Sequence, residues 1–229
     1  MFAYTGTENL EVMAEAVNYN RFLVTLIQNE VRLGEKVVDF GAGIGTFARA
    51  VAGDGHQVHC IEPDPGQLAR ISAAGLPASP DLACLQDGSV DLLYTFNVLE
   101  HIEDDVAALR ICHKKIKPGG RIMIYVPAFP ILYSSMDKKV GHFRRYTRAT
   151  LAARVRAAGF EVTRSEYVDS AGFLASLLFK AFGNDSGAIN RGALLVYDRR
   201  VFPLSRLADR LCRRAFGKNV CLVARRPEA

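Results

Sequence analysis

The stretch VVDFGAGIGTF, residues 37–47, places a short apolar run directly before three closely spaced glycines. The apolar run predicts a buried strand, and the residues after the glycines predict a helix that stops at Gly53. Glycines are needed in such a turn because the backbone must bend tightly and approach a ligand without Cβ atoms in the way. A strand, a Gly-rich turn and a helix in this order indicate a cofactor site at the carboxyl end of the strand.

The spacing of the glycines leaves the type of cofactor open. Gly41, Gly43 and Gly45 follow the form G-x-G-x-G, but Thr46 occupies the sixth position of the dinucleotide fingerprint. Glu62 ends the next apolar run, roughly 20 residues further on, where an acid can accept hydrogen bonds from both ribose hydroxyls. These features fit NAD or another adenosine cofactor. The plain alternative is a Gly-rich turn with an incidental acid nearby.

Apolar strand-like runs alternate with helix-like segments along the chain, which predicts an α/β doubly wound sheet. Residues 8–31 predict one N-terminal helix. A further helix is expected over about 103–117, with Gly119 and Gly120 in KPGG as its stop. The run 80–90 predicts a loop with a short or degenerate strand.

The end of the chain bears on where ligands bind. Some 50 residues, 170–218, separate the last two predicted strands. If the first of these strands is parallel to the others, the insertion leaves from the carboxyl edge of the sheet. The stretch 127–147, which contains MDKKVGHFRRYT, leaves from the same edge, and ligands bind there in open α/β sheets.

Composition excludes several classes of protein. The 229 residues are 49% hydrophobic and 23% charged, as in an ordinary globular domain, and the net charge of +5 is too mild to imply nucleic acid. The five scattered cysteines contain no C-x-x-C pair, so we expect a reduced, cytoplasmic chain without disulfides or a metal site. No signal peptide or transmembrane segment is expected.

Several linked segments resemble the class I S-adenosylmethionine (SAM) dependent methyltransferases. They are VVDFGAGIGTF, CIEPD, PDLACLQDGSVDLLYTFNVLEHIEDD and KPGGRIMIYVPA, and the likeness covers about residues 17–165. The resemblance implies a Rossmann-like seven-stranded sheet, parallel except for an antiparallel last strand. It divides one methyltransferase domain, 1–229, into a helical cap (1–31), a SAM-binding core (32–169), a helical lid or insertion (170–218) and a last strand with a tail (219–229).

The resemblance also implies which residues contact the cofactor. Those expected around the methionine part and the ribose are Asp39, Gly41, Ala42, Gly43, Gly45, Glu62 and Pro63. Asp81 and Leu82 correspond to the adenine contact, and Asn97 with Val98 would line the floor beneath the sulfonium. Tyr19 is the candidate for an aromatic cap over the cofactor. The alternative for Tyr19 is a helix residue that packs on the sheet.

Methyl transfer from a sulfonium is an in-line displacement, so the protein mainly has to align the acceptor and exclude water. A general base is needed only if the acceptor must lose a proton. The candidate catalytic residues on the expected edge are His142, His101 and Tyr146, and the candidate acceptor-binding residues are Arg145, Arg144 and Tyr133. His101 alternatively holds the loop or contacts the cofactor. Thr147 is expected to cap the helix that begins near Arg148.

The favoured function is methyl transfer from SAM, with S-adenosylhomocysteine as product, to a small-molecule or lipid-like, potentially anionic acceptor. An RNA methyltransferase, an NAD-dependent oxidoreductase and a non-catalytic SAM-binding protein stay open as alternatives. The insertion carries apolar residues beside many arginines. We expect its apolar side to pack on the domain; it would otherwise serve as a lid, a dimer face or a peripheral contact with an anionic membrane. The chain is expected to act as a monomer or a homodimer.

Overall fold

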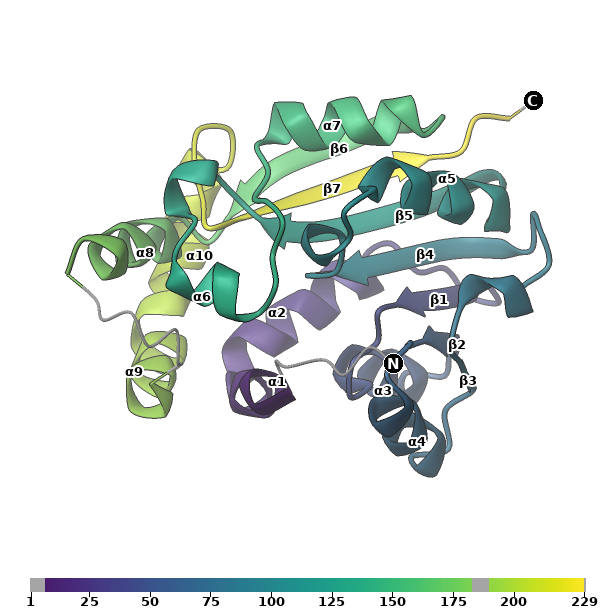
Figure 1. Cartoon of the computed structure of the whole chain (residues 1–229), viewed down its shortest axis with the longest axis horizontal. Helices are drawn as coiled ribbons and strands as arrows, with labels where there is room; N and C mark the ends of the chain where they lie inside the picture. The colour runs from purple at the N-terminus through teal and green to yellow at the C-terminus, as the bar shows by residue number, and fades with distance from the viewer. Residues whose placement is uncertain (1–6, 183–189, 229) are drawn as a thin grey trace.

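The computed structural model describes residues 7–182 and 190–228. Its sheet has the strand order β3-β2-β1-β4-β5-β7-β6 (Figure 1). The strands are β1 (Lys36–Phe40), β2 (Gln57–Ile61), β3 (Ala78–Ser79), β4 (Val90–Phe96), β5 (Ile116–Pro127), β6 (Glu161–Val168) and β7 (Asn219–Arg225). Strands β1 to β5 pair in parallel, whereas β7 is antiparallel to both β5 and β6. The predicted doubly wound sheet with an antiparallel last strand is confirmed.

Helices cover both faces of this sheet. They are α1 (Thr7–Ala14), α2 (Val17–Gln28), α3 (Thr46–Gly53), α4 (Pro65–Ala73), α5 (Asp105–Lys115), α6 (Ser135–Lys139), α7 (Arg148–Ala157), α8 (Ser170–Phe182), α9 (Arg191–Val196) and α10 (Phe202–Cys212). Short helical turns occupy Leu82–Cys84 (η1), Leu99–His101 (η2) and Pro130–Leu132 (η3), and a π-helical turn, Tyr197–Val201 (η4), joins α9 to α10. Residues of α2, α3 and α4 share one apolar core, and residues of α5 and α7 share the core on the opposite face.

The carboxyl ends of the parallel strands lie at one edge of the sheet, toward α6 and α8 (Figure 1). Because β6 and β5 are each antiparallel to β7, they are parallel to one another. The segment after β6 therefore leaves from the same edge as the segments after β4 and β5. This is the placement that the sequence predicted for the insertion and for the stretch 127–147.

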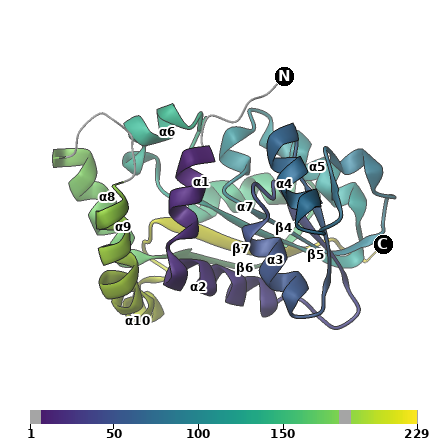
Figure 2. The same ribbon diagram turned by 90° about the horizontal axis from the view of Figure 1, so that it is seen from below.

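The N-terminal segment differs from the single helix that was predicted. The helix breaks after Ala14, and α2 starts at Val17 (Figure 2). The cause is distant in sequence, since Asp198 accepts hydrogen bonds from the backbone N–H groups of Asn18 and Tyr19 at 3.1 and 2.8 Å. A carboxylate from the insertion thus satisfies N–H groups at the start of α2, where no intrahelical acceptor is available.

The predicted stop of the helix before β5 is also wrong. The helix α5 ends at Lys115, and KPGG already belongs to β5. A Cβ at Gly120 would lie 2.6 Å from the side chain of Ile116 and 3.1 Å from the carbonyl oxygen of Asp91. The glycine thus allows close approach where β5 joins the sheet, at a register shift relative to β4.

Within the insertion, α10 packs on the domain with a face that leaves three of its leucines exposed, which differs from the expectation that the apolar side packs inward. Residues Phe202, Ser205 and Asp209 of α10 are buried, whereas Leu204, Leu207 and Leu211 are 67%, 60% and 89% exposed. Polar contacts explain the choice of face, because Asp209 accepts hydrogen bonds from the backbone N–H groups at the start of α8. No helix in the described part of the chain is long and apolar enough to cross a membrane.

Candidate active site

The Gly-rich loop between β1 and α3 has the geometry that its glycines predict. Gly41, Gly43 and Gly45 all have positive φ, at 82°, 56° and 74°. A Cβ at Gly41 would lie 2.3 Å from a methyl carbon of Val98, which follows β4. The loop is anchored to β2, since the N–H groups of Gly41 and Ala42 donate to the carbonyl oxygen of Ile61 at 2.8 and 3.1 Å. Glycine is thus required where two carboxyl-edge segments touch.

Glu62 and the exposed Pro63 follow β2 at the same edge. The Glu62 carboxylate is buried and accepts hydrogen bonds from the N–H groups of Gly43 and Asp64, at 2.7 and 2.9 Å. Burial raises the pKa of Glu62, and the two backbone donors partly offset that rise. The acid is therefore held against the Gly-rich loop, where it was expected to contact a ribose.

Asp39, near the end of β1, is the second buried carboxylate beside the loop. Its Oδ2 atom has no hydrogen-bond partner among the described residues. Burial raises the pKa of Asp39 to about 7; the Tyr94 hydroxyl beside it partly offsets that rise, and the nearby Glu62 carboxylate adds to it. An unpaired carboxylate oxygen next to a second acid is costly to bury. A ligand that carries positive charge would remove this cost, as the ammonium and sulfonium groups of SAM would.

The other expected cofactor contacts take different positions. Asp81 is exposed and accepts the N–H of Ala83, while Leu82 is buried. Asn97 is exposed at the end of β4 with a φ of 55°, a backbone conformation that non-glycine residues adopt rarely. The Tyr19 hydroxyl lies 3.0 Å from that of Tyr125. Burial raises the pKa of Tyr19, whose hydroxyl is thus neutral.

Beyond β4 and β5, the two candidate histidines come together. The rings of His101 and His142 lie 4.5 Å apart at an angle of 80°. Nδ1 of His142 lies 2.7 Å from Oδ1 of Asp137, and its Nε2 lies 3.8 Å from Oε1 of Glu100. Burial, with His142 nearby, lowers the pKa of His101 to about 4, so that imidazole is neutral at neutral pH.

Asp137 organises this region, although the sequence analysis did not single it out. Its carboxylate is fully buried and also accepts from the backbone N–H of Ser134 and from two nitrogens of Arg145. Burial opposes its ionisation, but the hydrogen bonds from His142 and Arg145 outweigh that effect and hold the pKa of the carboxyl well below its usual range. A Ser-x-x-Asp capping box at 134–137 was the signal that could have found it.

Other residues of the candidate set support this loop from within the protein. The Tyr146 hydroxyl is buried and donates to Asp105 at 2.7 Å, with the Leu99 carbonyl oxygen 3.1 Å away. Both contacts are with the interior of the protein, and a catalytic role for Tyr146 stays a prediction. The Tyr133 hydroxyl donates to the carbonyl oxygen of His142.

The two arginines are also engaged by the protein. Arg144 donates to the carbonyl oxygens of Ile102 and Glu103 and pairs with Asp105. Arg145 forms an ion pair with Asp137, and its side chain is 8% exposed. These donors hold the loop to the ends of β4 and β5, and binding of an acceptor by either arginine stays a prediction. Thr147 caps α7, as predicted.

The comparisons with known proteins agree with this geometry. A family model described as "Methyltransferase domain" matches residues 11–165, more than half of the chain. A curated relative from Xanthomonas euvesicatoria pv. vesicatoria, named ubiquinone biosynthesis O-methyltransferase, is 29% identical over 152 residues. That match covers 56% of this chain and 64% of the relative, so the chain spans less than two thirds of its length.

Two solved structures share the fold. A SAM-dependent methyltransferase from Mesorhizobium loti has a TM-score of 0.60 and 20% identity, over 89% of this chain and 96% of that one. A phosphoethanolamine N-methyltransferase from Haemonchus contortus, in complex with SAM, has a TM-score of 0.63 and 20% identity, over 92% and 52%. The glycine loop, the acid after β2 and the strand order agree with the family match, and the chain belongs to the class I SAM-dependent methyltransferases.

Proposed function

We propose that this chain transfers a methyl group from SAM to a hydroxyl oxygen of a small, lipid-like acceptor. The observation that carries the proposal is the pair of buried carboxylates, Asp39 and Glu62, at the ends of neighbouring strands. Two acids without a cation between them suit a positively charged nucleoside cofactor. The choice of oxygen rests on the curated relative, whose name specifies an O-methyltransferase.

Residues at the carboxyl edge would hold SAM. The unpartnered oxygen of Asp39 suits an ammonium group, and the Glu62 carboxylate suits the ribose hydroxyls. The Gly-rich loop lets the backbone approach, and Asn97, Val98, Asp81, Leu82 and Tyr19 complete the set that we propose. When bound, SAM supplies a methyl group on a positively charged sulfur, which is already activated for displacement.

The chain itself has to position the acceptor and to remove the proton of the acceptor hydroxyl. An attacking hydroxyl loses its proton as the new C–O bond forms, and we assign that step to the cluster of Glu100, His101 and His142. Glu100 and His101 follow β4, as do the residues expected beneath the sulfonium, whereas His142 follows β5. Asp137 fixes the ring of His142 through Nδ1, so that Nε2 points toward Glu100. The products are the methyl ether, S-adenosylhomocysteine and a proton.

The surface of the insertion supports the lipid-like part of the proposal. Leu204, Leu207 and Leu211 recur along one exposed side of α10, and the exposed side chain of Arg210 lies on the same helix. An apolar stripe beside cations suits an anionic bilayer surface. We propose that α10 rests on such a surface, which would bring the carboxyl edge close to an acceptor held in the membrane.

Calorimetric titration with S-adenosylhomocysteine and with NAD tests the cofactor assignment. We expect S-adenosylhomocysteine to bind, and Glu62→Ala to weaken it at least tenfold, about 1.4 kcal/mol. Binding of NAD without S-adenosylhomocysteine would refute the proposal. Transfer is then tested by mass shift on a panel of phenols with and without a polyprenyl chain, against an amine panel and RNA. Methylation of amines or RNA alone would contradict the proposed acceptor.

A further inference from the structure

Glu100 is a fully buried acid whose carboxyl has no hydrogen-bond partner on another described residue. Neither of its carboxylate oxygens has one among the described residues, and its side chain is 0% exposed. The guanidinium of Arg145 lowers the pKa of Glu100 through its charge, but it donates its hydrogen bonds to Asp137 and to the carbonyl oxygen of Ala128. Unsatisfied buried acids are rare in native proteins because each forfeits its hydration without compensation. The position of Glu100 therefore needs an explanation.

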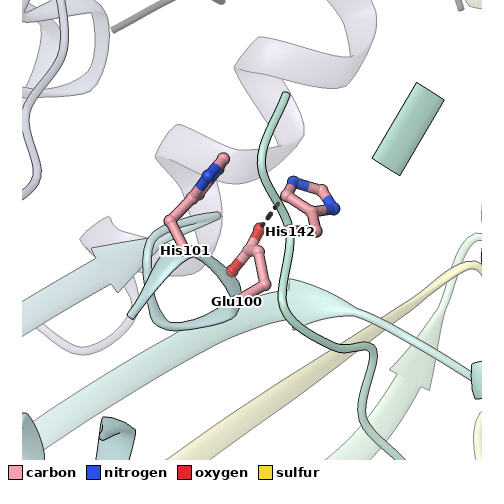
Figure 3. Close-up of side chains that lie close together, drawn as sticks. All are labelled: Glu100, His101 and His142. Carbon is pink, nitrogen blue, oxygen red and sulfur yellow. Dashed lines mark ion pairs between the residues drawn. The ribbon is translucent and has the colours of Figure 1, made fainter. Parts of the chain in front are cut away.

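Two imidazoles lie on the two sides of this carboxylate (Figure 3). His101 is the next residue in η2, whereas His142 comes from the loop between α6 and α7. One nitrogen of each ring and one oxygen of Glu100 all lie within 4.8 Å of one another. Segments from two parts of the chain thus direct three metal-binding side chains to one point.

The surroundings of His142 match those of a metal ligand. Its Nδ1 lies 2.7 Å from Oδ1 of Asp137, so Nδ1 carries the proton and the lone pair is on Nε2. Nε2 is the atom that lies 3.8 Å from Glu100. A carboxylate that orients a histidine through its other nitrogen is the usual outer contact of a metal-bound imidazole. Arg145 and the N–H of Ser134 in turn hold Asp137.

We propose that Glu100, His101 and His142 bind one divalent first-row transition-metal ion, with Zn²⁺ as the best probe. Two imidazoles and one carboxylate are a ligand set of catalytic zinc sites, which keep a further position open. Tetrahedral bonds of about 2.1 Å place ligand atoms about 3.4 Å apart, so side chains whose ligand atoms now lie within 4.8 Å of one another close by up to about 1.4 Å on binding. This proposal departs from the sequence expectation that the chain has no metal site.

A metal ion at this site would also have a role in the reaction, and that role rests on the proposed function, transfer of a methyl group to a hydroxyl oxygen. An acceptor hydroxyl that occupies the open position would lose its proton more readily, because a bound cation lowers the pKa of a coordinated hydroxyl. His142 then acts as a ligand and not as a base, and the proton leaves to solvent.

The test uses the full chain after chelation, titrated with Zn²⁺ alone by calorimetry, with metal content measured after dialysis. We expect one Zn²⁺ per chain, and at least tenfold weaker binding in His142→Ala and in Glu100→Gln. His56→Ala, a histidine before β2, is the matched control and should bind as the wild type does. Co²⁺ should give ligand-field bands without the thiolate charge-transfer band that binding at the exposed Cys84 would produce.

Absence of Zn²⁺ binding, or equal affinity in His142→Ala, Glu100→Gln and the wild type, would overturn the inference. Circular dichroism of each variant shows that it is folded, and Glu100→Gln keeps the size of the side chain. Titration of the metal-free chain with S-adenosylhomocysteine separates the two proposals. If that ligand binds while Zn²⁺ does not, the metal inference fails and the methyltransferase proposal stands; the reverse result refutes the methyltransferase proposal alone.

Discussion

Arg145 holds Asp137 with two nitrogens, Nε at 2.8 Å from Oδ1 and Nη2 at 2.9 Å from Oδ2. The same Oδ1 atom contacts His142, so one buried carboxylate connects a cation to an imidazole at the candidate active site. Arg145 therefore positions His142 through Asp137. A lysine would be a poor replacement, because its single ammonium nitrogen cannot make this bidentate contact.

Arg145→Ala should lower the free energy of unfolding by about 3 kcal/mol, because it leaves the buried Asp137 without its cation. Urea unfolding measures this change. Arg156→Ala, on the exposed side of α7, is the control and should change stability by less than about 0.5 kcal/mol. If Arg145→Ala instead keeps its stability and raises KM for the acceptor, Arg145 binds the acceptor directly.

Gly41→Ala should cost more stability than Gly34→Ala, although both glycines have a φ near 80°. Nothing lies within 4 Å of a Cβ at Gly34, so that change incurs only the strain of the left-handed backbone, about 1–2 kcal/mol. A Cβ at Gly41 also meets Val98, which adds about 1–3 kcal/mol. Thermal unfolding compares the two variants. Val98→Ala should recover part of the loss in Gly41→Ala; no recovery would show that Val98 is not the cause.

Binding of S-adenosylhomocysteine should strengthen as pH rises from about 5 to 7 and then level off. The raised pKa of Asp39, about 7, means that its carboxyl is half protonated near neutral pH, and only the carboxylate attracts an ammonium group. Titration calorimetry at a series of pH values measures this, and Asp39→Asn should lose the dependence. A wild-type affinity that stays constant between pH 5 and 7 would contradict the assignment.

The same group predicts a pH dependence of stability in the ligand-free chain. Between its unfolded pKa, near 4, and its folded pKa, about 7, Asp39 binds more protons in the folded state. Its contribution to stability is thus fully present below about pH 4 and is lost as pH rises toward 7. We expect the free energy of unfolding of the wild type to fall relative to that of Asp39→Asn as pH rises across this range, which urea unfolding of both proteins measures. Parallel curves would show that Asp39 titrates normally.

Leu207→Glu with Leu211→Glu should reduce sedimentation of the chain with phosphatidylcholine–phosphatidylglycerol vesicles. The change removes apolar surface from α10 and adds charge that the anionic lipid repels. Leu33→Glu is the control, because Leu33 is 95% exposed but lies before β1, away from the insertion. Binding of the wild type should also fall with added salt. Equal sedimentation of the double variant and the wild type would remove α10 as a membrane contact.

Local patterns made the strand–loop–helix unit and its acid readable from the sequence. The glycines of 41–45 and Glu62 are spaced by the geometry of one β-α-β unit, which is a short-range property. The cap at Thr147 was readable for the same reason. The break between α1 and α2 was not, because the carboxylate that causes it, Asp198, lies some 180 residues further along the chain.

The sequence by itself therefore determined the fold class and the family, since these follow from periodicity and from motifs within a few dozen residues. The edge at which the cofactor binds stays a proposal. Only the tertiary structure decided what the basic loop does. In the sequence, Arg145 and Tyr146 are a cation and a phenol near the active edge; in the fold, each faces a buried acid. The meeting of Glu100 with His142 is likewise a tertiary contact, because strand pairing brings the end of β4 beside the segment that follows β5. The fold also decides which buried carboxylates are neutralised by a neighbour, as Asp137 is, and which have oxygens without a hydrogen-bond partner among the described residues, as Glu100 and Asp39 do.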